Sequence, residues 1–97
     1  MDELPDYEAL PGGDLVLQGL ADLQHGVESV PSLLVLIGGP RLRRLEFEVP
    51  IVQPSDDLPE HRLYQLLAAA HGNAAHSRYN ALLRRLVSFE RAAQCVR

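Results

Sequence analysis

Apolar side chains recur every three or four residues over the last quarter of the chain, and no other pattern constrains the fold as strongly. The positions step by 4, 3, 4, 3, 4 and 3 residues through Ala75, Tyr79, Leu82, Leu86, Phe89, Ala93 and Val96. Such a seven-residue repeat places these side chains on one face of an α-helix. A helix of about 22 residues is about 33 Å long. We therefore expect a long helix that packs in its own domain or against a second chain.

The composition favours helices over strands upstream of this segment as well. The chain has 18 Leu and 10 Ala against 8 Val, 2 Ile and no Thr, and the first two residue types are the better helix formers. Asp14 is an N-cap candidate for a helix over about 15–25 that ends at Gly26. Gly19 lies in the middle of that helix, where glycine is unfavourable. We therefore expect another helix to approach closely at Gly19.

A further helix is predicted before the heptad segment. Asp57 and Glu60 resemble a capping box, which predicts a helix over about 58–71 that ends at Gly72. The side chains expected on its buried face are Leu63, Leu66, Leu67 and Ala70.

Residues 29–49 allow two interpretations. Ser29 is an N-cap candidate, Pro31 suits a first helical turn, and Pro40 can begin another turn after the two preceding glycines, which together favour helices. However, residues 33–37 are apolar on every side and residues 45–49 alternate as a strand would. Helix is the favoured interpretation, and a hairpin at about 33–49 in an α+β fold is the alternative.

A chain of 97 residues has room for one domain. Residues 1–13 contain four acids, two prolines and a Gly-Gly pair, and they predict an irregular, flexible acidic arm on which Tyr7 and Leu10 can dock. Residues 14–97 form a single helical domain in this interpretation. The predicted fold is all-α, a compact bundle of four to five helices.

The charge is divided unevenly along the chain. Residues 1–60 hold 12 acids and 3 arginines, which gives −9, whereas residues 61–97 hold 6 arginines and 1 acid, which gives +5. The favoured explanation is that the two halves attract each other within one fold. The alternative is a basic surface for an external anion. The arginines considered for such contacts are Arg41, Arg43, Arg44, Arg78, Arg84 and Arg91.

No motif for catalysis, a metal or a cofactor is evident, so we expect a non-enzymatic protein without any of them. The four histidines do not have ligand spacing on one helix face, and Cys95 is far from them in sequence. No uninterrupted apolar run exceeds five residues, whereas a membrane span needs about 20. The first six residues lack the features of a secretory signal. The expected location is cytoplasmic.

Binding to a protein partner, or to a second copy of the chain, is the leading functional hypothesis. The heptad register places Arg85 at position g and Glu90 at position e, as in an interchain pair of a parallel homodimer. The residues predicted to contact the partner are Tyr79, Leu82, Arg85, Leu86, Phe89 and Glu90.

The alternative hypothesis is a nucleic-acid-binding regulator. Two short helices separated by a turn, followed by the basic segment Arg41–Arg44, resemble a helix-turn-helix arrangement. The acidic N-terminal half and a pI of about 5.4 argue against binding to a polyanion.

Overall fold

The computed structural model describes residues 6–50 and 58–96, and every regular element in these two ranges is helical. In chain order the elements are η1 (Tyr7–Ala9), α1 (Gly13–Gln24), α2 (Val30–Ile37), α3 (Gly39–Arg44), α4 (Pro59–His71), η2 (Gly72–Ala74) and α5 (Ala75–Cys95), where η marks a 3-10 turn. The predicted all-α fold is therefore confirmed. The alternative hairpin at about 33–49 is wrong, because those residues form most of α2, all of α3 and the turn that follows. Within the two described ranges, no helix is both long enough and apolar enough to cross a membrane.

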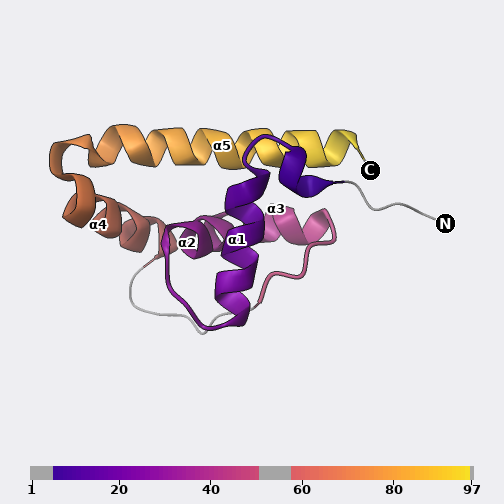
Figure 1. Cartoon of the computed structure of the whole chain (residues 1–97), viewed down its shortest axis with the longest axis horizontal. Coiled ribbons are helices and arrows are strands. Elements are labelled where there is room, and N and C mark those ends of the chain that lie inside the picture. The colour runs from indigo at the N-terminus through magenta and orange to yellow at the C-terminus, as the bar shows by residue number, and fades with distance from the viewer. Residues whose placement is uncertain (1–5, 51–57, 97) are drawn as a thin grey trace.

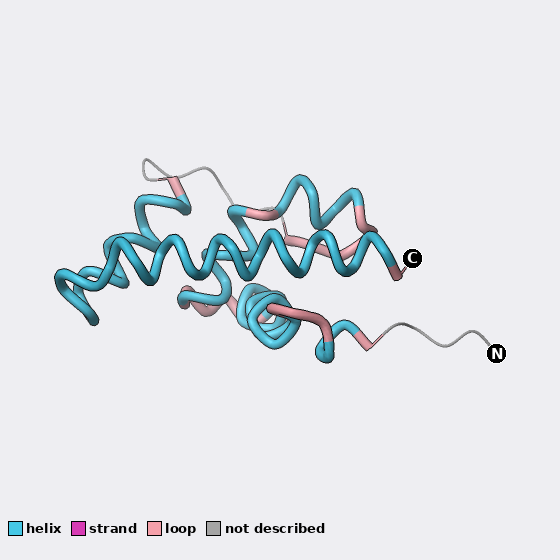
Figure 2. The backbone as a smooth tube through the Cα atoms, turned by 90° about the horizontal axis from the view of Figure 1, so that it is seen from above, coloured by secondary structure: helices cyan, strands magenta, loops and turns pink. Residues whose placement is uncertain are grey.

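Helix α5, with 21 residues, is the longest of the described helices and lies along one side of the molecule (Figure 1). In that view α4 folds back beneath the first half of α5, and α3 lies beneath its second half. Helix α1 runs at a steep angle to α5 in Figure 1 and is therefore seen end-on beside α5 in Figure 2. The long helix thus has the other elements packed along one side and leaves the rest of its surface to solvent.

The core is filled by side chains from all five α-helices. Four positions of the heptad pattern are fully or almost fully buried in it, namely Ala75, Leu86, Phe89 and Ala93. Tyr79 and Leu82 pack against the core and are partly buried, while Val96 follows the end of α5 and is exposed. The buried partners from the other helices include Val16, Leu33, Leu34, Val35, Leu42, Leu63 and Leu67. The heptad face is therefore packed within the domain, the first of the two arrangements expected for it.

Helices α1 and α2 approach each other closely at Gly19, as its position predicted. A Cβ atom at this residue would lie 2.3 Å from the carbonyl oxygen of Pro31 and 2.5 Å from Cγ2 of Val35. Both distances are far below van der Waals contact, so only glycine fits at this crossing.

The connection between α1 and α2 is closed by hydrogen bonds. Gly26 has a φ of +70°, and the N–H groups of Gly26 and Val27 donate to the carbonyls of Leu23 and Asp22. This is the Schellman pattern that ends many helices. The Ser29 hydroxyl then donates to Asp22 Oδ2 over 2.6 Å, which holds the start of α2 against the last turn of α1.

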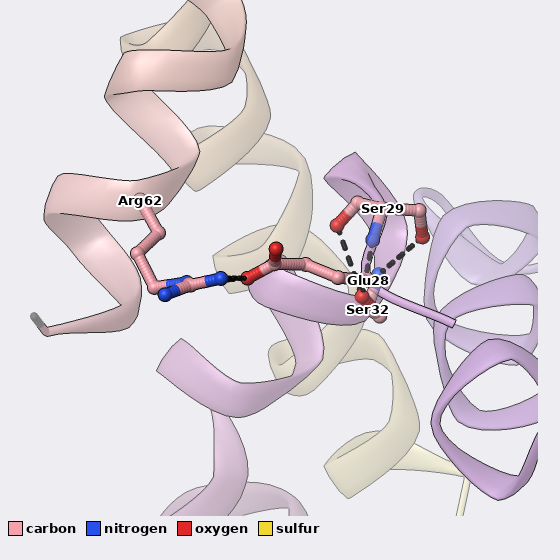
Figure 3. A network of polar contacts seen from close by, with 4 residues as sticks. All are labelled: Glu28, Ser29, Ser32 and Arg62. Atoms are coloured by element: carbon pink, nitrogen blue, oxygen red, sulfur yellow. Dashed lines mark hydrogen bonds and ion pairs between the residues drawn. The ribbon is translucent and has the colours of Figure 1, made fainter. Parts of the chain in front are cut away.

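Helix α2 begins at a capping box formed by two serines. The Ser29 side chain accepts from the Ser32 N–H, and the Ser32 hydroxyl oxygen accepts from the Ser29 N–H over 2.7 Å. The predicted N-cap at Ser29 is confirmed. Figure 3 shows this cap beside Glu28, whose carboxylate receives the guanidinium of Arg62 from α4. The start of α2 is thus tied to both α1 and α4.

The predicted N-cap of the first helix is wrong. The N-cap is Gly12, with a φ of +73°, and Asp14 lies in the first turn of α1. A Cβ at Gly12 would lie 2.5 Å from the carbonyl oxygen of Arg85. The close passage of this turn over the backbone of α5 therefore requires a glycine and decides where α1 begins.

The predicted buried face of α4 is only half correct. Leu63 and Leu67 are buried, but Leu66 is 38% exposed and Ala70 is exposed. Because α4 lies at one end of the molecule, only a narrow stripe of it contacts α2 and α5 (Figure 1). The proposed capping residue Asp57 lies outside the described residues.

The second half of the predicted N-terminal arm is packed on the domain. Tyr7 in η1 makes an edge contact with Phe47 at 4.8 Å between ring centroids, and Phe47 lies 5.6 Å from Phe89 of α5. Aromatic pairs at these separations stabilise each other beyond their buried area. The three rings thereby connect η1, the segment after α3 and the second half of α5.

Candidate interaction surface

The residues predicted to contact a partner lie mostly against the chain's own core. Leu86, Phe89 and Glu90 are buried, and Tyr79 and Leu82 pack on the core cluster. Arg85 remains exposed, and its Nη2 donates to Asp14 Oδ1 over 2.9 Å. A second chain could reach this heptad face only by displacing the helices that cover it.

The uneven charge distribution is balanced in part within the fold. Arg62 pairs with Glu28, and Arg85 pairs with Asp14, so in both cases an arginine of the basic half meets an acid of the acidic half. These ion pairs are solvent-exposed and contribute little stability individually, about 1 kcal/mol or less. They nevertheless support the interpretation that the two halves attract each other.

The third ion pair involves a buried carboxylate. Glu90 on α5 is 5% exposed, and its Oε1 lies 3.8 Å from Nη1 of Arg41 on α3. Burial raises the pKa of Glu90 above its ordinary value, and the charge of Arg41 partly opposes that rise. Gly38 leaves room for the carboxylate, because a Cβ there would lie 3.1 Å from Glu90 Oε2.

Next to this ion pair, α5 presents apolar side chains to solvent. Leu83 is partly exposed and Val87 is 36% exposed. Together with Ile37 and Pro40, at the junction of α2 and α3, they line a depression of about 350 Å³ that we call the apolar groove. A second depression, of about 560 Å³, begins at the same two α5 side chains and continues to Arg84 and Arg91. The apolar groove is thus bordered by arginines.

The arginines considered as anion contacts have different environments. Arg41 pairs with Glu90, and Arg43 donates to the carbonyls of Val49 and Pro50 over 3.3–3.4 Å, which directs it away from a ligand. The other four are exposed and form no ion pair within residues 6–50 and 58–96, namely Arg44, Arg78, Arg84 and Arg91.

The helix-turn-helix resemblance does not extend to a recognition helix. Such a helix must present polar side chains to the DNA groove, whereas α2 is buried at Ser32, Leu33, Leu34 and Val35. Helix α3 exposes its three arginines but has only six residues, of which Gly39 and Leu42 are buried. Any contact with nucleic acid would therefore depend on the arginines of α3 and α5 alone.

No group of three side chains able to hold a metal ion occurs in the part of the chain that the structure describes. Cys95 is exposed at the end of α5.

The apolar groove was not predicted from the sequence, although one signal for it was present. Leu83 is an apolar side chain one position outside the heptad face, and it widens the apolar stripe of α5. The contributions of Ile37 and Pro40 depend on how α2 and α3 pack against α5, which no local pattern reveals.

Comparison with known proteins gives no match, since no protein-family model, no curated protein and no solved structure corresponds to the chain.

Proposed function

We propose that the chain is a small non-catalytic binding protein that holds an acidic amphipathic helix of a protein partner in the apolar groove. The observation that carries this proposal is the position of Leu83 and Val87, which are partly exposed on α5 beside Arg84 and Arg91, two arginines that form no ion pair with any residue the structure describes. We further propose that this binding takes place in the cytoplasm.

The spacing along α5 supports a helical occupant. Leu83 and Val87 are separated by one helical turn, and Arg84 and Arg91 are separated by two. The nine residues from Leu83 to Arg91 extend about 12 Å along the helix. An amphipathic helix that presents apolar residues at positions i and i+4 can follow such a stripe.

The charges support an acidic occupant. The only acid of α5 is Glu90, which is buried, whereas Arg78, Arg84, Arg85 and Arg91 are exposed. Acidic residues on the partner would therefore be attracted to Arg84 and Arg91, while Glu90 at the groove is itself buried beside Arg41. Most of the affinity would come from the desolvated apolar contacts, and the arginines would favour fast association and orientation.

The test compares two variants that carry the same valine-to-glutamate substitution at different places on the surface. Val87→Glu places a charge in the groove, whereas Val27→Glu makes the same change at a valine that is 48% exposed in the connection before α2. We expect affinity purification from native cells to recover a stoichiometric protein with wild type and Val27→Glu, and to lose it with Val87→Glu. If the protein remains bound to Val87→Glu, and circular dichroism shows that both variants are folded, the proposal is wrong.

Self-association is distinguished in the same experiment by light scattering. If the purified wild type is dimeric and Val87→Glu is monomeric, the occupant of the groove is a second copy rather than a different acidic protein.

Binding to nucleic acid is the second candidate, and it is favoured by the four exposed arginines that form no ion pair among the described residues, Arg44, Arg78, Arg84 and Arg91. It predicts affinity for duplex DNA or RNA that falls steeply with added salt. It further predicts that Arg44→Ala and Arg84→Ala each weaken binding to all sequences by a similar factor.

A further inference from the structure

A third depression lies near the C-terminal end of α5, where α3 runs beside that helix (Figure 1). It has a volume of about 550 Å³ and is lined by Arg41, Arg44, Leu45, Arg91 and Gln94. We call it the arginine hollow. Two helices contribute its three guanidinium groups, because Arg41 and Arg44 belong to α3 and Arg91 belongs to α5.

The guanidinium groups in the hollow have free donors. Arg44 and Arg91 form no ion pair within the described ranges, and no acid lines the hollow. Arg41 stands 3.8 Å from Glu90, a separation longer than a hydrogen bond. The N–H groups of Arg41 therefore remain able to donate to a ligand. The attraction of the buried Glu90 carboxylate holds the Arg41 guanidinium beside the hollow.

The charge of the hollow matches a doubly charged anion. Three arginines and the one carboxylate of Glu90 sum to +2, and a phosphate monoester carries a charge of about −1.5 to −2 at neutral pH. A single carboxylate would neutralise only half of this charge. Arginine also presents its N–H groups in a planar fork that fits two phosphate oxygens at once.

We propose that the arginine hollow binds a phosphate monoester group, contacted by Arg41, Arg44 and Arg91 with the Gln94 amide as a further donor. The group can belong to a small molecule or to a phosphorylated side chain, since the hollow would recognise the same oxygens in both. The hollow shares Arg41 and Arg91 with the surroundings of the apolar groove, but the apolar side chains that carry the proposed function, Leu83 and Val87, do not line it, so phosphate binding can be tested separately from the proposed function.

The test is a titration of the ¹⁵N-labelled full-length chain with inorganic phosphate at pH 7.5 and constant ionic strength, followed through the arginine Nε–Hε signals. We expect saturable shifts at Arg41, Arg44 and Arg91. Arg78 serves as the reference, since it lies 13 residues before Arg91 on α5, about 20 Å along the helix. Equal, non-saturating shifts at all arginines, or no shift, would overturn the proposal.

Three variants sharpen the result. We expect Arg44→Gln and Arg91→Gln each to weaken phosphate binding by about tenfold or more, because each removes a charge-assisted contact. Arg78→Gln removes one positive charge from the same helix outside the hollow, and it should change the affinity by less than about twofold if only the hollow binds. A similar loss in all three variants would indicate general charge attraction and contradict a defined site.

The source of the phosphate group is resolved with a phosphoserine peptide and its unphosphorylated twin. Binding of the phosphopeptide at least tenfold tighter than inorganic phosphate, with no binding of the twin, assigns the group to a phosphorylated protein. Equal affinities for the phosphopeptide and inorganic phosphate assign it to a small molecule. Tighter binding of duplex DNA than of the phosphopeptide at the same three arginines would overturn the proposal in favour of nucleic acid.

Discussion

Replacing Gly19 with alanine tests how closely α1 and α2 approach each other. At an open helical position this change would stabilise the protein by about 1 kcal/mol, because alanine is the better helix former. Here the added Cβ would lie 2.3 Å from a backbone oxygen of Pro31 and 2.5 Å from Val35. Trimming Val35 cannot relieve the first contact, so the helices must separate.

The net effect follows from these two opposing contributions. Overpacking of a dense core costs about 1–3 kcal/mol, and a backbone contact this short places Gly19→Ala at the upper end. After subtraction of the gain in helix propensity, we expect Gly19→Ala to lower the free energy of unfolding by about 2 kcal/mol. For a domain of this size that corresponds to a decrease in Tm of roughly 8–16 °C.

Urea unfolding monitored by circular dichroism at 222 nm measures this loss. The control is Gly26→Ala, where the added Cβ meets no atom within 4 Å and only the positive φ is unfavourable, at a cost of about 1 kcal/mol. A Gly19→Ala variant that is as stable as wild type would refute the close crossing of α1 and α2.

Four further predictions concern other parts of the fold. Because the pKa of Glu90 is raised in the folded state, this residue lowers stability as the pH rises above 4.5; Glu90→Gln should flatten that decrease in urea unfolding between pH 4.5 and 7. Ser29→Ala removes the N-cap of α2 and should cost about 1 kcal/mol in the same assay. Phe89→Ala leaves a cavity at a fully buried position and should lower the free energy of unfolding by about 3–5 kcal/mol, which is enough to unfold a marginally stable domain; calorimetry would then show a lowered or absent unfolding transition. Arg85→Ala breaks an exposed ion pair with Asp14 and should change Tm by only a few degrees, since the pair contributes less than about 1 kcal/mol.

Local signals in the sequence were sufficient to locate most of the helices. Ser29 and Pro31 mark the start of α2, and Gly26 marks the end of α1, because each acts through hydrogen bonds or backbone angles within a few residues. These signals also decided correctly between helices and a hairpin at about 33–49. The close crossing at Gly19 was predictable for the same reason, as a glycine in a helix interior requires an explanation.

Features that depend on distant parts of the chain were not predictable. Asp14 has a suitable side chain for an N-cap, but the close approach of Gly12 to the backbone of α5 fixes the start of α1 two residues earlier than an N-cap at Asp14 would place it. The heptad pattern identified the apolar face of α5 without revealing what covers it. Glu90 was therefore predicted as an interchain contact, although α3 places Arg41 beside it. The apolar groove and the arginine hollow arise from the packing of α3 on α5, and only the arginines themselves were evident beforehand.

The closed connection between α1 and α2 has a consequence for the order of folding. Its hydrogen bonds join residues a few positions apart, whereas the bond from Arg85 to Asp14 joins residues 71 positions apart. Closing the short loop costs much less chain entropy than docking α5 on α1. We therefore expect the pair of helices α1 and α2 to be formed in the folding transition state and α5 to pack against them afterwards. In stopped-flow experiments Ser29→Ala should mainly slow refolding, and Val87→Ala, on α5 in the apolar groove, should leave the refolding rate unchanged.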